Sequence, residues 1–204
     1  MFPSIYFTGY YPNIIHVSNE DINIIVHDKN IIKKFLNSKN KQSFIDDCVN
    51  MIKDSNFYSK DYVMNNINNS ISNLLKKELD AISTYNPQYF IKLSTFIEDN
   101  YMKNILSVSL NHHTKYIYRY LSTEIFNIIN INITPYPEEI DPQVRCVSCI
   151  IYESVKNVIN KNFEKNKFSQ RELPHVDLIT YLSFHYDKYS LIKEYLIENI
   201  HKYS

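Results

Sequence analysis

The sequence predicts a mainly α-helical fold, a single helical domain of residues 1–204 with a small N-terminal β element of two or three short strands. Three observations lead to this prediction. The chain has one glycine, too few for the tight hairpin turns of a β-sandwich or barrel. Apolar residues recur at helical spacing from about residue 28 onward. No linker rich in proline, glycine or serine divides the chain, so one core is expected.

The first 27 residues are expected to form an extended and turn segment. Residues 4–8 and 13–17 are rich in β-branched and aromatic side chains, and the stretch from Gly9 to Pro12 separates them. A third extended piece, residues 22–27, follows a polar turn. These pieces are predicted to form the small sheet.

Residues 28–103 are predicted to form a helical block, because apolar residues recur there at i, i+3 and i+4. Asp28 is expected to cap the first helix. A long helix is expected to end before Asn86, since a residue that precedes proline disfavours the helical conformation. The four helices are expected over residues 28–36, 44–52, 60–85 and 88–102.

Residues 104–114 are expected to form a strand-loop segment, in which the apolar stretch 105–110 leads into Asn111-His112-His113-Thr114. The C-terminal part, residues 115–204, is predicted to be helical. Residues 133–137 are expected to form a loop, and the polar stretch 165–174 is expected to be mobile. The helices are expected over residues 117–129, 142–163, 175–186 and 189–202.

Composition excludes several classes of function. Lysine plus arginine and aspartate plus glutamate both total 22, so no surplus of positive charge favours a nucleic acid or an anionic membrane as partner. A single glycine excludes the glycine-rich loops that hold nucleotide phosphates. No apolar stretch reaches the length of a transmembrane segment. The N-terminus lacks the pattern of a secretory signal, and a cytoplasmic location is therefore expected.

No metal site is expected. Cys146 and Cys149 have the spacing of a metal knuckle, but no second pair of ligands follows at the distance of a zinc ribbon. Both are expected on an amphipathic helix, in or near the core. His175 with Asp177, and the similar pair ten residues later, are expected in solvated or helix-terminal roles. The many tyrosines at helical spacing are interpreted as residues of the core and its rim.

Two motifs are candidates for chemistry. The segment Tyr6-Phe7-Thr8-Gly9-Tyr10-Tyr11-Pro12-Asn13 places the only glycine beside a proline, where a turn is expected to need a special backbone conformation. The segment Asn111-His112-His113-Thr114 places two histidines between an apolar stretch and a helix, where loop side chains commonly reach a site.

The order of these motifs, from Phe2 to Asn13 and then from Ile105 to Thr114, resembles the later part of WcbI-like polysaccharide-biosynthesis proteins. These are bacterial capsule-associated proteins regarded as acetyltransferases, with motifs that read approximately F-P-x-I-Y-F-x-G-Y-H-P-D and N-H-P-T. The resemblance covers nearly all of this chain. It departs from the family at three positions, where the chain has Tyr11, Asn13 and His113 in place of histidine, aspartate and proline.

The family's early segment, with a cysteine and the coenzyme A region, has no counterpart before Met1. The resemblance therefore implies the C-terminal half of an acetyltransferase-like protein, incomplete on its own, with a separate N-terminal catalytic half as partner. It also implies a sugar or polysaccharide substrate. No tightly bound cofactor is expected, and coenzyme A or acetyl-coenzyme A is expected as co-substrate.

Acyl transfer needs a base that activates the acceptor hydroxyl or an activated nucleophile, and oxyanion donors. His112 is the candidate base, and no activated nucleophile is evident in the sequence. The expected substrate-binding residues are Tyr10, Tyr11, Asn13, Asn111, His113 and Thr114. Two alternatives stay open: a noncatalytic helical interaction protein, such as an immunity or host-directed factor, and a metal-dependent hydrolase that uses the scattered histidines.

Overall fold

The computed structural model describes residues 5–16, 26–132, 148–163, 168–170 and 173–199. Within these ranges the chain is mainly α-helical, with a small antiparallel β element near the N-terminus, as the sequence predicts. The described elements are β1 (Ile14–His16), β2 (Val26–Asp28), α1 (Lys29–Asn37), α2 (Lys41–Lys53), α3 (Lys60–Tyr85), α4 (Leu93–Asn100), α5 (Lys115–Ile128), α6 (Glu153–Ile159), β3 (Phe168–Gln170), β4 (Leu173–Val176), α7 (Leu178–Leu191) and α8 (Lys193–Asn199).

Local capping explains where α1 begins and where α3 begins and ends. The carboxylate of Asp28 accepts hydrogen bonds from the backbone amides of Asn30 (2.7 Å) and Ile31, which confirms the predicted start of α1. The hydroxyl of Ser59 accepts from the amide of Tyr62 at the start of α3. The same helix ends at Asn86, whose left-handed conformation (φ 40°) stops it before the following proline.

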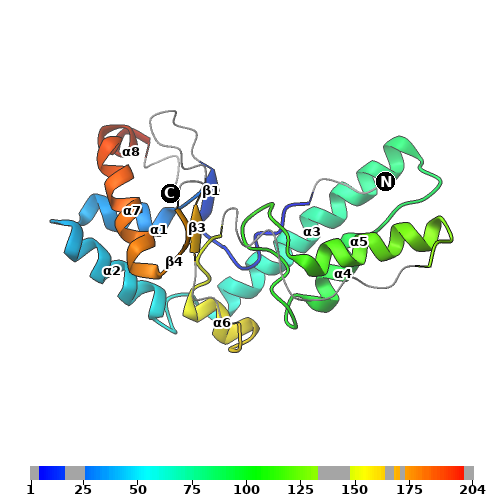
Figure 1. Cartoon of the computed structure of the whole chain (residues 1–204), viewed down its shortest axis with the longest axis horizontal. Coiled ribbons are helices and arrows are strands. Elements are labelled where there is room, and N and C mark those ends of the chain that lie inside the picture. Colours follow the sequence, from blue (N-terminus) through cyan, green and yellow to red (C-terminus); the bar gives the residue numbers. More distant parts are fainter. Residues whose placement is uncertain (1–4, 17–25, 133–147, 164–167, 171–172, 200–204) are drawn as a thin grey trace.

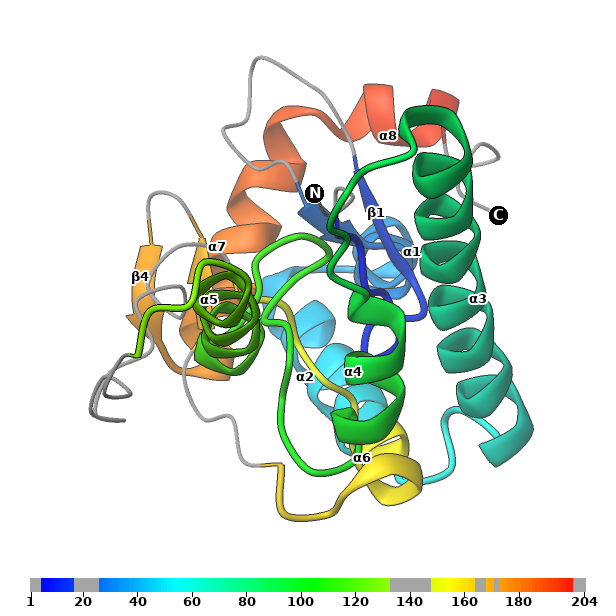
Figure 2. The ribbon, with the colours of Figure 1, turned by 90° about the vertical axis from the view of Figure 1, so that its right-hand side faces the viewer.

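The elements form two groups (Figure 1). Helices α1, α2, α7 and α8 pack on one side together with the two hairpins, and α3, α4 and α5 lie on the other side. Helix α4 runs alongside α3 in both Figure 1 and Figure 2. Helix α6 packs against both α2 and α3, so it links the two groups.

The N-terminal hairpin aligns Ile14 with Asp28 and Ile15 with His27. This register brings the end of the first motif to the start of α1, where the amide of Lys29 donates to the carbonyl of Asn13 (3.0 Å). Residues 5–8 are not a strand, contrary to the prediction, and residues 17–25, which include most of the third expected piece, lie outside the described residues.

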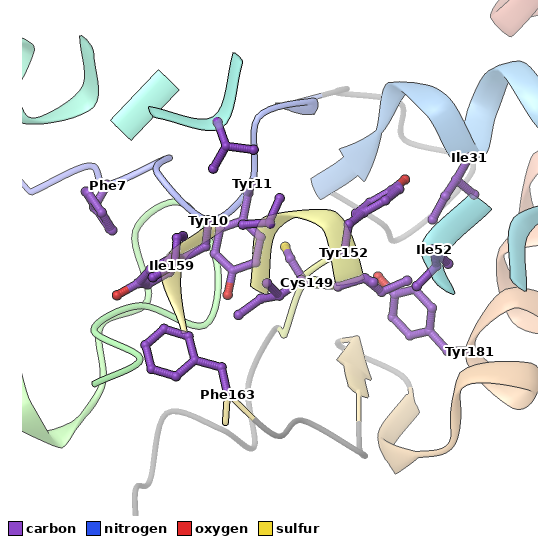
Figure 3. Packing of buried hydrophobic residues seen from close by; sticks show 14 of the residues in the cluster. Phe7, Tyr10, Tyr11, Ile31, Ile52, Cys149, Tyr152, Ile159, Phe163 and Tyr181 are labelled. Carbon is purple, nitrogen blue, oxygen red and sulfur yellow. The ribbon is translucent and has the colours of Figure 1, made fainter. Parts of the chain in front are cut away.

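The buried core extends from the N-terminal segment into both groups (Figure 3). Its largest fully buried side chains include Phe7, Tyr10, Phe44, Tyr152 and Tyr189. Burying one such side chain contributes about 1.5–3 kcal/mol. Several of these buried side chains are tyrosines, and a buried tyrosine hydroxyl needs a hydrogen-bond partner. Hydrogen bonds from these hydroxyls therefore help to hold the loops around the core.

Two helices differ from their predicted bounds because of contacts distant in sequence. Helix α4 begins only at Leu93, where the carboxylate of Glu78 accepts from the amides of Leu93 (2.6 Å) and Ser94 (3.0 Å). Residues 148–152 are not helical, because the amide of Cys149 donates to the carbonyl of Val108 (2.7 Å). Only α6 remains of the helix expected over 142–163, and residues 142–147 lie outside the described residues.

The C-terminal part also differs from the prediction. Residues 168–170 and 173–176 form an antiparallel hairpin in a stretch that was expected to be polar and mobile. His175 is therefore in strand β4, and α7 starts after Asp177, whose carboxylate accepts from the amide of Thr180 (2.9 Å). Tyr189 belongs to α7 and does not start the closing helix. The end of that predicted helix, residues 200–202, lies outside the described residues.

Candidate functional site

The two motifs that the sequence singles out contact each other. The amide of Phe7 donates to the carbonyl of Leu110 (3.0 Å), and the carbonyl of Ile5 lies 3.3 Å from Nε2 of His113. A third segment completes the arrangement, since the amide of Cys149 bonds the same loop at Val108. Residues 105–114 are thus a loop held between the N-terminal segment and residues 148–149.

The expected strand over 105–110 is a tight loop closed by hydrogen bonds to its own other end. The amide of Val108 donates to the carbonyl of His112 (2.8 Å), and a single antiparallel bridge joins Ser107 to His113. The amide of Thr114 donates to the carbonyl of Leu106 (2.9 Å). These bonds fix the loop backbone, with the turn at residues 109–111 and His112 directly after it.

His112 is the half-buried imidazole of this loop. Its Nδ1 lies 2.7 Å from the hydroxyl oxygen of Ser109, which is fully buried. Burial lowers the pKa of His112 below its ordinary value, so the ring is neutral near pH 7. Among the described residues Nε2 has no hydrogen-bond partner. Ser109, for which the sequence carries no signal, therefore lies where it can hold the orientation of the His112 imidazole.

Tyr10 holds the start of the loop. Its side chain is fully buried, and its hydroxyl donates toward the carbonyl oxygens of Tyr101 (2.9 Å) and Asn104 (2.8 Å). The same oxygen accepts from the amide of Leu106 (3.3 Å). Burial raises the pKa of Tyr10 far above its ordinary value, so the hydroxyl keeps its proton. The structure places this side chain in the core, with its polar atom bonded to loop backbone.

Tyr11 has a similar environment. It is buried, and its hydroxyl donates to the carbonyl of Ser107 (2.8 Å). Figure 3 shows Cys149 beside Tyr11 in the core. Burial is also the main reason why the pKa of Tyr11 is raised. Cys149 is therefore a buried core cysteine but lies on an extended segment, while Cys146 lies outside the described residues.

Asn13 is half-buried and lies apart from the loop, at the start of α1. Its amide nitrogen contacts the hydroxyl of Tyr58, which also accepts from the side-chain amide of Asn30 (2.7 Å). Asp28 lies beside this group, and burial raises the pKa of its carboxyl to about 6, against the lowering effect of its bond to the Asn30 amide. This polar group was not predicted, because it is assembled from three separate segments.

The other residues of the second motif divide into buried and exposed ones. Thr114 is buried, and its hydroxyl donates to the carbonyl of Ile105 (2.7 Å) without capping α5. His113 is buried, and burial lowers its pKa below the ordinary value. Asn111 is exposed beside His112. Asn111 and His112 are therefore the residues of this motif that solvent reaches.

Gly9 is required by space and not by a special backbone conformation. Its φ is not positive, which corrects the expectation from the sequence. A Cβ at this position would clash with the tip of the Phe7 ring and would lie 2.8 Å from its Cε2. Helix α3 holds the turn, since Asn66 donates from its side chain to the carbonyls of Thr8 (2.9 Å) and Gly9.

Two searches within the described ranges give negative results. No group of three or more histidine, cysteine, aspartate or glutamate side chains is arranged there to hold a metal ion. None of the helices in the same ranges has the length and apolar character needed to cross a membrane.

The structure thus defines a helical protein in which a histidine-bearing loop is held by an N-terminal aromatic segment. No protein-family model matches the sequence, and no curated protein matches it. The fold is similar to that of WcbI, a polysaccharide biosynthesis enzyme, with a TM-score of 0.69 and 14% sequence identity. The match covers 93% of this chain and 61% of WcbI, whose structure is that of the native protein without a disulfide bond between coenzyme A and a cysteine. The chain has a WcbI-like fold.

Proposed function

We propose that this protein takes part in polysaccharide biosynthesis as the substrate-binding or accessory part of an acyl transfer, with His112 as the general base. The observation that carries the proposal is the His112 loop itself. A neutral imidazole lies directly after the turn of a hydrogen-bonded loop, where Ser109 contacts its Nδ1. The similarity to WcbI, a polysaccharide biosynthesis enzyme whose structure is described with coenzyme A, supports a role in polysaccharide biosynthesis and is compatible with a coenzyme A thioester as co-substrate.

The proposed chemistry uses the two nitrogens of His112 differently. When Nδ1–H donates to the Ser109 oxygen, the lone pair of Nε2 is free to accept a proton. In the transfer, Nε2 takes the proton of the acceptor hydroxyl while the acceptor oxygen bonds to the acyl carbon and the thioester C–S bond breaks. The imidazolium then returns the proton to the sulfur that leaves. Burial favours the neutral form of His112, which is the form that can accept this proton.

The remaining motif residues take two proposed roles. We assign Asn111 to contact the acceptor, because it is exposed beside His112. Tyr10, Tyr11 and Thr114 position the loop, since their hydroxyls bond its backbone. His113 positions it through Ile5, and Asn13 acts at a distance by fixing the N-terminal segment against Tyr58.

We also propose a separate catalytic half as partner, which supplies the oxyanion donors that acyl transfer needs. Among the described residues, Ser109 is the hydroxyl bonded to His112, and it is fully buried, so an incoming acyl group does not reach it. The chain spans 61% of the length of WcbI. A separate catalytic half that supplies the oxyanion donors and completes a coenzyme A site shared with this chain fits this arrangement.

Calorimetric titration with coenzyme A and acetyl-coenzyme A tests the proposal. Saturable binding of acetyl-coenzyme A is expected for the wild type and for Lys39→Gln, an exposed lysine between α1 and α2. His112→Ala is expected to weaken binding about tenfold, as loss of one good polar contact does. Equal affinities for His112→Ala and the wild type, or absence of binding at millimolar ligand, would reject His112 as part of a coenzyme A thioester site.

One observation favours a second function, that of a noncatalytic interaction protein. Leu75 and Leu79 are exposed one turn apart on α3, and Ile125 on α5 and Ile129 just after the end of α5 are also exposed. Exposed apolar pairs of this kind occur at protein interfaces. This function predicts that Leu79→Lys and Ile129→Lys abolish partner binding in cells while the fold is retained, whereas the acyl-transfer proposal predicts no such effect.

A further inference from the structure

A cavity of about 390 Å³ lies between the start of α3 and α6, and no residue of the His112 loop lines it. Most of its lining side chains are hydrogen-bond donors. The residues that line it are Ser55, Asn56, Tyr58, Ser59, Lys60 and Ser154, together with Asn157 and Val158. Neither the sequence motifs nor the proposed acyl transfer involves this cavity.

The N-terminus of α3 supplies one part of the site. This helix has 26 residues, and the first amides of an α-helix have no acceptor inside the helix. They carry a partial positive charge that favours anions. Ser59 caps the helix by accepting from the amide of Tyr62, which leaves its own O–H free to donate into the cavity.

Ser154 supplies an independent observation. Its side chain is 1% exposed, and its hydroxyl oxygen has no hydrogen-bond partner within the described part of the chain. A buried hydroxyl without a partner costs about 1–3 kcal/mol, so such groups in folded proteins call for a specific explanation. Ser154 lines the cavity, and a ligand oxygen bound there would give this hydroxyl its partner.

The charges around the cavity also favour an anion. Lys60 is exposed at its edge and forms no ion pair with any described residue. Four carboxylates lie nearby but do not line the cavity. Asp54 accepts from the amide of Asn56 (2.8 Å), Glu153 pairs with Lys156 (3.2 Å), and Asp28 beside Tyr58 caps α1. Asp61 lies in the first turn of α3. The lining itself contains one cation and no carboxylate.

We propose that this cavity binds a phosphate group. Backbone amides, hydroxyls, an amide side chain and one lysine offer more donors than a carboxylate accepts, and they suit the several oxygens of a phosphate. The cavity is larger than a single phosphate ion, so the organic part of a phosphate ester fits beside the ring of Tyr58 and Val158. The phosphate is either free inorganic phosphate or the phosphate group of a larger ligand such as coenzyme A.

Titration of the ¹⁵N-labelled full chain with inorganic phosphate, followed by amide NMR, tests the site directly. Saturable shifts are expected for the amides of Lys60, Asp61 and Ser154. Ser154→Ala and Lys60→Gln are each expected to weaken binding by about tenfold, and Lys39→Gln, an exposed lysine elsewhere, to leave it unchanged. Thermal melting of each variant shows that it is folded, and Ser154→Thr, which keeps the hydroxyl, is expected to retain more binding than Ser154→Ala.

Two further arms separate the sources of the phosphate. If the site takes the 3′-phosphate of coenzyme A, coenzyme A binds more tightly than dephospho-coenzyme A, and Lys60→Gln removes the difference. If it takes free phosphate or another ester, inorganic phosphate binds and the two coenzymes do not differ. His112→Ala leaves phosphate binding intact in either case, so failure of the acyl-transfer proposal does not affect this test. Absence of saturable shifts at millimolar phosphate, or equal binding by wild type, Ser154→Ala and Lys60→Gln, would overturn the proposal.

Discussion

Replacing Tyr10 by phenylalanine tests whether this tyrosine acts by holding the loop. The substitution keeps the buried ring and removes one oxygen. That oxygen donates toward the carbonyls of Tyr101 and Asn104 and accepts from the amide of Leu106, so buried backbone groups lose their partner. A neutral hydrogen bond contributes about 1 kcal/mol, and a buried group left unpaired costs about 1–3 kcal/mol. The free energy of unfolding is therefore expected to fall by about 2–3 kcal/mol.

Urea unfolding followed by circular dichroism measures this change, provided that the slope of the transition stays constant. Tyr11→Phe, which removes the bond to the carbonyl of Ser107, is expected to cost about 1 kcal/mol or more. Tyr85→Phe is the matched control, because Tyr85 is 66% exposed, and its effect is expected to stay within about 0.5 kcal/mol. A Tyr10→Phe protein as stable as the control would refute the loop-holding role.

Three more variants test other parts of the fold. Gly9→Ala is expected to destabilise the protein by about 1–3 kcal/mol in thermal melts, since the new methyl group clashes with the Phe7 ring; a neutral effect would contradict the steric explanation. Glu78→Ala leaves the start of α4 uncapped inside the core and is expected to lower the free energy of unfolding in urea by about 3 kcal/mol. The control Glu98→Ala, at an exposed position, is expected to lower it by less than about 0.5 kcal/mol, and equal losses would argue against the capping role. Burial and the neighbouring His27 lower the pKa of His185 to about 3. Between about pH 6.5 and 3 the unfolded chain therefore binds more protons at His185 than the folded chain, and the free energy of unfolding falls as pH falls. The raised pKa of Asp28 has the opposite effect between about pH 4 and 6. In an Asp28→Asn background the free energy of unfolding is therefore expected to fall by up to about 1.4 kcal/mol per pH unit below pH 6.5, and a flat profile would contradict this assignment.

The sequence predicts those elements whose signals are local. Asp28 was expected to cap the first helix and the long helix was expected to end before Asn86, and the structure confirms both. Capping of this kind needs no partner distant in sequence. Apolar spacing likewise predicts α1, α2, α3 and α5 with small errors at their ends.

Elements set by distant contacts were not predictable in the same way. Periodicity favours a helix through Cys149, but the bond from its amide to Val108 keeps that segment extended. Helix α4 begins where Glu78, fifteen positions earlier, accepts the amide of Leu93. No pattern within either segment records such a partner.

The candidate site was predicted only in part. The two motifs were chosen for turn residues and adjacent histidines, and their mutual contact agrees with that choice. The sequence does not show which tyrosine hydroxyls are hydrogen-bonded inside the core. Tyr10 and Tyr11 were therefore expected to bind substrate, whereas the structure places both hydroxyls in hydrogen bonds to backbone carbonyls. No sequence pattern pointed to Ser109, because its contact with His112 depends on how the loop folds.

The imidazole signals of His112 provide the most direct test of the central claim that this loop is an acyl-transfer site. They are assigned in a ¹³C-resolved NMR spectrum by comparison with His112→Gln. Burial places the pKa of His112 below its ordinary value, so its titration is expected to have its midpoint below about 6.5, and acetyl-coenzyme A is expected to shift these signals saturably. Signals that stay unchanged at saturating acetyl-coenzyme A, while other residues respond, would contradict the account and place the thioester elsewhere on the protein.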